Sequence, residues 1–138
     1  MNSSSLRPEV RWAVEAAQDK QAVDITVLNL SGAGAFAEYF LLCSGSSQPQ
    51  IRAISDAIEE RLGREGIFLA HREGKSSAEW VLLDYGYFVA HVFSERAREY
   101  YDLERLWRNA QRVDFPAPGK PPEPPAESER NSTQQSPE

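Results

Sequence analysis

A continuous apolar run near the middle of the chain limits the possible folds more than any other feature of the sequence. The run YFLLC at residues 39–43 places apolar side chains on both sides of an extended backbone. Such a strand is typical of a sheet whose two faces are both covered. We therefore predict a strand here that is buried on both faces.

The segment after this run has clear signals for an amphipathic helix. Ser47 and Gln50 have the S-x-x-Q spacing of a capping box, and Pro49 falls in the first turn, where a proline is tolerated. Aliphatic residues then recur on one helical face: Ile51, Ile54, Ile58 and Leu62. Gly66 is a natural residue for the C-terminal end of this helix.

The remaining segments predict a small mixed β-sheet flanked by helices. A first amphipathic helix is expected over about residues 6–19, and strands are expected at residues 24–30, 67–70, 80–84 and 87–93. The last two strands are joined tightly at Tyr85-Gly86 and should form an antiparallel hairpin. Asp102 is expected to cap a final helix whose apolar face carries Leu103, Leu106, Trp107 and Ala110. This order of elements predicts an α/β or α+β domain.

The composition changes sharply after Val113. Residues 114–138 are rich in proline and almost free of aliphatic residues, with Phe115 as the one apolar anchor that can dock back on the domain. A segment of this kind buries too little apolar surface to offset the entropy lost on ordering. We expect a folded domain over residues 1–113 and a disordered tail rich in proline, glutamate and serine over residues 114–138.

The composition also excludes several classes of protein. No apolar run approaches the roughly 18 residues of a membrane-spanning helix, and the N-terminus lacks the apolar core of a secretory signal. One cysteine, Cys43, and two histidines, His71 and His91, predict neither a disulfide framework nor a metal site. The formal net charge of −6 argues against coating DNA or RNA through a broad basic surface. We expect a cytoplasmic protein without metal or cofactor; a transit peptide is the alternative, and Glu9 speaks against it.

The loop Gly45-Ser46 raises the possibility of a nucleotidyltransferase. It lies between a buried strand and a helix N-terminus, where free N–H groups suit a phosphate. Such an enzyme also needs two carboxylates spaced i and i+2 on a following strand to hold magnesium. Asp84 has no carboxylate at position 82 or 86, so the acidic pair is missing. The alternative is that Gly45 makes a turn and Ser47 caps the helix.

A cysteine nucleophile is a weaker possibility. Cys43, His91 and Asp84 could supply a nucleophile, a base and an orienting group. Cys43, however, lies inside an apolar run, where cysteine is usually an inert small hydrophobe. His91 lies in the strand YFVAHVF and is more typical of a half-buried structural residue.

The segment EWVLLDYG suggests a protein-binding patch. Trp80, Leu82 and Asp84 alternate along the predicted strand and should face the same side, with Tyr85 following at the turn. Tryptophan and tyrosine dominate the energetics of protein interfaces. Composition alone leaves this interpretation balanced against a plain core role for the aromatic residues.

Four blocks of sequence resemble the ribosomal silencing factor family, also known as Iojap-like proteins. They are AVDITVLNLSG, FAEYFLLCSGSSQPQIRAISDAIEE, EWVLLDYGYFVAHVF and YYDLERLW, in that order, and they cover roughly residues 8–110. The resemblance implies a small mixed α/β domain similar to a nucleotidyltransferase core without its catalytic carboxylates. It implies a non-catalytic repressor of translation that binds the large ribosomal subunit at universal large-subunit protein fourteen and blocks joining of the small subunit when nutrients are scarce.

The resemblance also implies which residues meet the partner. Trp80, Leu82, Asp84 and Tyr85 match the family's contact segment, and His91 is a weaker candidate. Family members are often dimers when free, so a homodimer is a further expectation, and some members assist maturation of the large subunit. A biogenesis factor and a divergent nucleotidyltransferase therefore stay open as alternatives. The chain departs from the family at Asn29, where aspartate is common, and at Pro49, where a polar residue is common.

Overall fold

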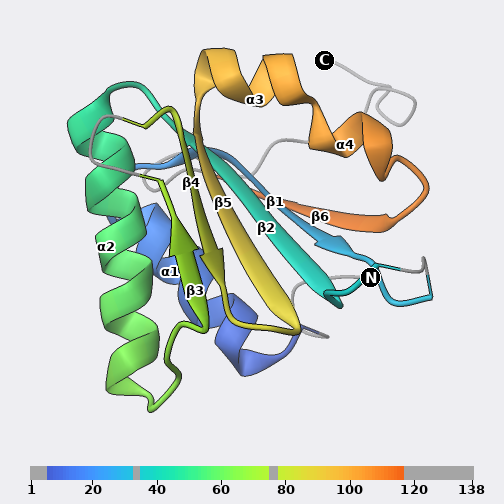
Figure 1. The fold of residues 1–138 in the computed structure, drawn as a ribbon, viewed down its shortest axis with the longest axis horizontal. Helices are drawn as coiled ribbons and strands as arrows, with labels where there is room; N and C mark the ends of the chain where they lie inside the picture. Colours follow the sequence, from blue (N-terminus) through green and yellow to red (C-terminus); the bar gives the residue numbers. More distant parts are fainter. Residues whose placement is uncertain (1–5, 33–34, 75–77, 117–138) are drawn as a thin grey trace, which may run out of the picture.

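The computed structural model describes residues 6–32, 35–74 and 78–116 (Figure 1). The elements follow in the order α1 (Pro8–Asp19), β1 (Val23–Asn29), β2 (Tyr39–Gly45), α2 (Gln48–Arg64), β3 (His71–Glu73), β4 (Trp80–Asp84), β5 (Phe88–Ser94), α3 (Glu95–Tyr101), α4 (Leu103–Leu106) and β6 (Gln111–Phe115). No helix among these residues is long and apolar enough to cross a membrane.

The strands form one mixed sheet with the order β3-β4-β5-β2-β1-β6. β2 and β5 run parallel, and every other neighbouring pair is antiparallel. β2 lies inside this sheet, and all its residues are buried except Phe40, which is half-buried. The predicted mixed sheet flanked by helices is confirmed. The apolar run at residues 39–43 lies inside it as β2, where both of its faces are covered.

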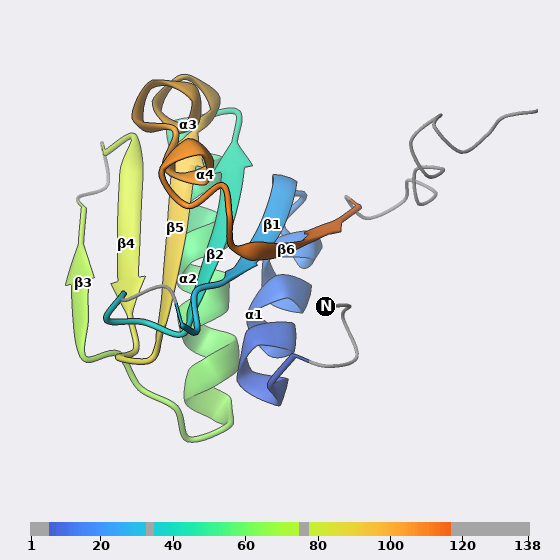
Figure 2. The same ribbon diagram turned by 90° about the vertical axis from the view of Figure 1, so that its right-hand side faces the viewer.

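The first face of the sheet carries the larger core. Alternate residues of four strands point to this side and are buried: Ile25, Val27, Leu41, Cys43, Val81, Leu83, Ala90 and Val92. Figure 2 shows α1 and α2 behind the sheet on this side. The apolar stripe predicted for the second helix is buried against it: Ile51, Ile54, Ile58 and Leu62.

The second face is covered only in part. α3 and α4 lie across one end of it (Figure 2), over a smaller core. The buried members of that core are Leu28, Leu30, Leu42, Phe93 and Ala97. Burial alternates strictly along β4: the side chains that point to the first face are buried, and those that point to the second face are only half-buried. The sheet therefore keeps an apolar surface that the described helices leave open.

Two predicted elements differ from the structure. Residues 67–70 do not form a strand; Ile67 and Leu69 pack on the core while Phe68 is 74% exposed, and the short β3 begins at His71. The final helix begins after Asp102 as predicted but ends at Leu106, so Trp107 and Ala110 lie beyond it; Asp102, with φ of 49°, separates it from α3. The side chain of Asp102 makes no capping hydrogen bond at the start of α4. Ser94, which the sequence also suggests as a helix cap, does cap α3, because its hydroxyl accepts from the N–H of Ala97.

The folded part extends beyond the predicted boundary at Val113. Asp114 and Phe115 belong to β6, which pairs along β1, and Phe115 packs against the larger core. The side chain of Phe115 therefore docks on the domain. Asp114 is ordered with it, because β6 pairs with β1 and places Asp114 opposite Thr26. The tail predicted to be disordered lies, from residue 117 onward, outside the described residues.

Candidate partner-binding face

Strands β4, β5 and β2 arrange their side chains in rows across the second face. The register gives the rows Asp84–Val89–Phe40, Leu82–His91–Leu42 and Trp80–Phe93–Ser44. Five of these side chains are partly buried, and we call them the open face: Phe40, Trp80, Leu82, Asp84 and Val89. The predicted alternation that places Trp80, Leu82 and Asp84 on one side is confirmed.

Trp80 is held in place by contacts from two elements, β5 and α3. Its indole N–H donates to Nδ1 of His91 on β5 at 3.1 Å. Its ring lies 5.1 Å from that of Phe93 and 4.5 Å from that of Tyr101 on α3, measured between ring centroids. An aromatic side chain with so many neighbours presents a rigid surface to a partner and loses little entropy when bound.

His91 lies beneath the open face rather than on it. Its side chain is 3% exposed, and the ring of Phe40 packs edge-on against it at 4.5 Å. Because an indole N–H can only donate, Nδ1 of His91 must accept, and the neutral ring carries its proton on Nε2. Burial lowers the pKa of His91 from 6.5 to about 4. We therefore assign His91 the role of positioning Trp80.

Asp84 lies at the far end of the open face from Trp80. One carboxylate oxygen accepts from the N–H of Gly86 at 2.8 Å and so supports the turn between β4 and β5. On the edge strand β3, His71 pairs with Asp84 across the sheet and its ring contacts the carboxylate of Glu73. The open face therefore ends in polar and acidic groups on the β3 side.

Tyr85 is not part of the open face. It is 8% exposed, belongs to the larger core and stacks on Phe88 at 5.7 Å with an interplanar angle of 14°. Burial raises the pKa of Tyr85, so it stays a neutral phenol. The structure therefore brings Trp80, Leu82 and Asp84 together and sends Tyr85 to the opposite side.

Sequence reasoning missed two members of the open face, Phe40 and Val89. Both belong to strands that it predicted correctly, but their place depends on which residues pair across β2, β5 and β4. Alternation within FVAHV puts Val89 on the same side as His91. That signal could have found Val89, whereas nothing local indicates which face Phe40 occupies.

The loop Gly45-Ser46 has its polar groups engaged by the chain itself. The side-chain oxygen of Gln50 accepts from the backbone N–H of Ser46 at 2.6 Å and from its hydroxyl at 3.0 Å. The amide nitrogen of Gln50 donates to the carbonyls of Lys20 and Gln21 after α1. Of the predicted capping box, the contact of Ser47 with the N–H of Gln50 is confirmed, while the Gln50 side chain turns to Ser46 instead. The backbone and hydroxyl donors of Ser46, which a phosphate would need here, are thus already used.

We expect Gly45→Ala to lower the free energy of unfolding by about 1–3 kcal/mol through overpacking. A Cβ atom at this position would lie 3.1 Å from Cγ1 and 3.3 Å from the backbone nitrogen of Ile51. Urea denaturation measures the loss. Gly63→Ala in α2 is the matched control, since its Cβ would meet nothing nearer than Phe68 at 3.8 Å and should be neutral or stabilising. Equal effects of the two substitutions would contradict the packing role of Gly45.

The proposed cysteine nucleophile is not assembled. Cys43 points to the first face and is fully buried, and burial raises the pKa of its thiol to about 12. His91 points to the second face, so the sheet separates the two side chains. Within residues 6–32, 35–74 and 78–116, no three side chains of histidine, cysteine, aspartate or glutamate gather as metal ligands.

Comparison with known proteins assigns this chain to a family. The family model described as "Ribosomal silencing factor during starvation" matches residues 3–138. The chain belongs to the ribosomal silencing factor family. Its members regulate translation, and the family name implies the ribosome as partner.

Relatives of this silencing factor share both its sequence and its structure. The Bacillus subtilis (strain 168) protein named ribosomal silencing factor RsfS is 40% identical over 115 residues, which cover 83% of this chain and 95% of that protein. A crystal structure of a Chromobacterium violaceum protein matches with a TM-score of 0.70 and 33% identity, covering 72% of this chain and 83% of that one. A Bacillus halodurans structure matches with a TM-score of 0.65 and 39% identity, covering 71% and 91%.

Proposed function

We propose that this silencing factor binds the large ribosomal subunit through universal large-subunit protein fourteen and so blocks joining of the small subunit when nutrients are limiting. The observation that carries the proposal is the open face. Half-buried Trp80 and Phe40 flank the half-buried aliphatic side chains of Leu82 and Val89 there, and α3 meets this surface only at its Trp80 end, through Tyr101. A contiguous apolar surface rimmed by polar groups is typical of a protein interface.

The chemistry of the open face suits a basic protein. Trp80 is a rigid aromatic anchor of the kind that dominates binding energy. Asp84 and Glu73 border the apolar centre, and the carboxylate of Asp84 keeps one oxygen beyond its bond to Gly86. Acidic groups at the rim steer a positively charged partner toward the face. Most ribosomal proteins are basic because they neutralise RNA.

The mechanism that we propose is steric and needs no bond-making chemistry. A folded domain fixed on the intersubunit face of the large subunit occupies the space that the small subunit must enter. The engaged donors of Ser46 and the separation of Cys43 from His91 support a non-catalytic role. In the free protein, a second copy of the chain is the partner that we expect on the open face.

Co-sedimentation tests the proposal directly. The purified chain is centrifuged with isolated large subunits, and small subunits are then added. We expect the chain to pellet with large subunits and to reduce the formation of complete ribosomes, and we expect it to bind isolated universal protein fourteen. A chain that stays in the supernatant overturns the proposal. A chain that pellets without affecting joining favours the biogenesis alternative instead.

Leu82→Arg is expected to weaken binding to large subunits about a hundredfold or more. The substitution places a charged side chain at the centre of the apolar surface and opposes a basic partner. Leu82 is half-buried and its side chain does not enter the larger core, so the domain should remain folded. The measurement is the dissociation constant from co-sedimentation, with circular dichroism to confirm folding.

Asp19→Asn is the matched control for Leu82→Arg. It changes the net charge by the same amount but lies exposed at the end of α1, behind the first face. We expect normal binding from this variant. If Leu82→Arg binds as tightly as the control, the open face is not the surface that meets the large subunit.

A further inference from the structure

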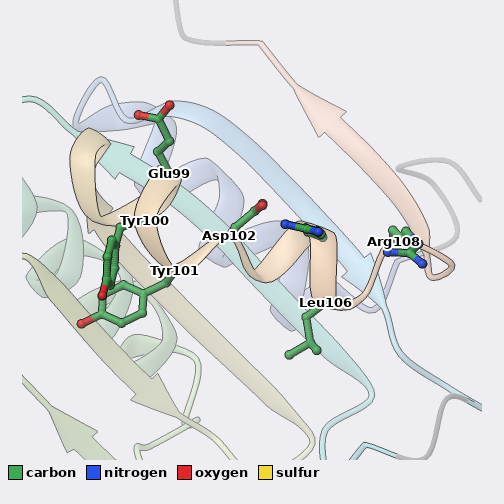
Figure 3. Close-up of a pocket in the computed structure, with 7 residues that line it drawn as sticks. Glu99, Tyr100, Tyr101, Asp102, Leu106 and Arg108 are labelled. Carbon is green, nitrogen blue, oxygen red and sulfur yellow. The ribbon is translucent and has the colours of Figure 1, made fainter.

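A second exposed surface adjoins the open face on α3 and α4. Three large side chains there are well exposed: Tyr100 at 78%, Tyr101 at 50% and Leu106 at 70%. Tyr101 also contacts Trp80, with 4.5 Å between ring centroids, so this surface continues directly from the open face. Figure 3 shows Tyr100, Tyr101 and Leu106 on the same side of the two short helices.

Two arginines on this surface form no ion pair with a described residue. The neighbouring guanidinium groups are engaged by carboxylates: Arg96 with Glu79, Arg98 with Glu104 and Arg112 with Asp114. Arg105 and Arg108 are exposed, and neither forms an ion pair with any residue that the structure describes. Both line the same depression as Tyr100, Tyr101 and Leu106, with a volume of about 540 Å³. We call these five residues the α3–α4 surface.

We propose that the α3–α4 surface contacts ribosomal RNA of the large subunit at the edge of the open face; this inference rests on the proposed function. Arginine guanidinium groups bind phosphates through paired N–H donors. Exposed tyrosine rings stack on unpaired bases, whatever their sequence. Tyr100 suits this role, because its ring packs perpendicular to Tyr101 and leaves most of its surface free.

The arrangement of charge explains why such a contact is compatible with an acidic chain. The carboxylates of Glu99 and Asp102 also line the depression, but Figure 3 shows them pointing away from the side that the tyrosines occupy. With a net charge of −6, the whole chain should not bind free RNA strongly. Once the open face is docked on a ribosomal protein, the tethered α3–α4 surface meets nearby RNA at a high effective concentration.

The test compares binding of the full chain to isolated large subunits and to isolated universal protein fourteen over a range of salt concentrations. The variant Arg105→Gln/Arg108→Gln removes both free guanidinium groups. Arg52→Gln/Arg64→Gln is the matched control, because these arginines are exposed on α2 and also form no ion pair with a described residue. Tyr100→Ala removes the stacking ring with little risk to folding, since that residue is 78% exposed.

We expect Arg105→Gln/Arg108→Gln to weaken binding to large subunits about tenfold and to flatten the slope of log K against log salt by roughly 1.5. Tyr100→Ala should weaken binding about tenfold without changing that slope. Neither variant should alter binding to the isolated ribosomal protein. The inference is overturned if Arg105→Gln/Arg108→Gln keeps the slope of the control, or if it weakens binding to the isolated protein equally. A failure of the proposed function can be distinguished from a failure of this inference, because in that case the unaltered chain binds neither large subunits nor the isolated ribosomal protein.

Discussion

Replacing Arg98 by alanine is expected to lower the free energy of unfolding by about 3–5 kcal/mol, the largest effect of any single substitution that we consider. The side chain of Arg98 is 10% exposed. It donates to both carboxylate oxygens of Glu104, at 3.1 and 2.8 Å. Its other donors reach the carbonyl of Asp24 and the hydroxyls of Ser44 and Thr26.

The reason for the large effect is that Arg98 joins α3 and α4 to the ends of β1 and β2. The substitution leaves the half-buried carboxylate of Glu104 without its main partner, and it removes the donor that Arg98 supplies to the buried hydroxyl of Ser44; the Thr26 hydroxyl still accepts from Arg112. The guanidinium of Arg98 holds the pKa of Glu104 below its usual range. The stabilisation by this pair is therefore present above pH 4.5 and is lost as the pH falls through the lowered pKa of Glu104.

Urea denaturation at neutral pH measures this effect, with Arg96→Ala as the matched control. Arg96 lies two positions away on the same helix and pairs with Glu79, but its side chain is 81% exposed. An exposed pair contributes little, so the control should lose no more than about 1 kcal/mol. Similar losses from the two variants would show that Arg98 is not the residue that fastens α3 and α4 to the sheet.

The role of Arg98 also illustrates which features of this fold can be predicted from the sequence. Local signals predicted α2, the hairpin and the alternation along β4, because each depends on residues within a few positions of one another. Arg98 meets Asp24 across 74 positions and Thr26 across 72, and no periodicity reports such contacts. The left-handed backbone of Asp102 was equally hidden, since an aspartate before an apolar stripe normally caps a helix with an extended backbone.

The open face likewise contains residues that the local sequence predicts and residues that it does not. Three of its members lie on one strand, so strand parity sufficed to group Trp80, Leu82 and Asp84. Tyr85 follows Asp84 directly, and the same parity sends it to the opposite face, where it stacks on Phe88. The sequence analysis nevertheless placed Tyr85 in the protein-binding patch, because it is aromatic and lies next to the turn. Phe40 needed the parallel pairing of β2 with β5, which depends on the whole sheet.

The stability of the domain is expected to fall by roughly 3 kcal/mol between pH 6.5 and pH 4 because of His91 alone. The folded state holds this ring neutral, with its pKa lowered to about 4 by burial. In the unfolded chain the ring takes up a proton below about pH 6.5, so acid favours unfolding across this interval. Above pH 6.5 the ring is neutral in both states, and this contribution to the pH dependence disappears.

The hydrogen bonds around His91 disfavour its protonation in the folded state, as its burial does. A proton added to Nδ1 would face the indole N–H of Trp80, which now donates to that atom at 3.1 Å. Two donors cannot share this bond, so acid also frees Trp80 from its position on the open face. Nε2 already lacks a hydrogen-bond partner among the described residues, and a charged ring would gain none there.

Urea denaturation at pH 7, 6 and 5 tests this expectation, together with the tautomer of His91 observed by nitrogen NMR. His91→Gln should be less stable at neutral pH but should lose little more as the pH falls toward 5, because the buried titrating ring is gone. His71→Gln removes the other histidine and should keep the steep loss of the parent chain. If His91 in the folded protein titrates near pH 6.5, or carries its proton on Nδ1, then it does not position Trp80 as the structure indicates. Because the ring of His91 stays neutral in the folded protein down to about pH 4, binding of the folded parent chain to large subunits should not change between pH 7 and pH 5 through this residue.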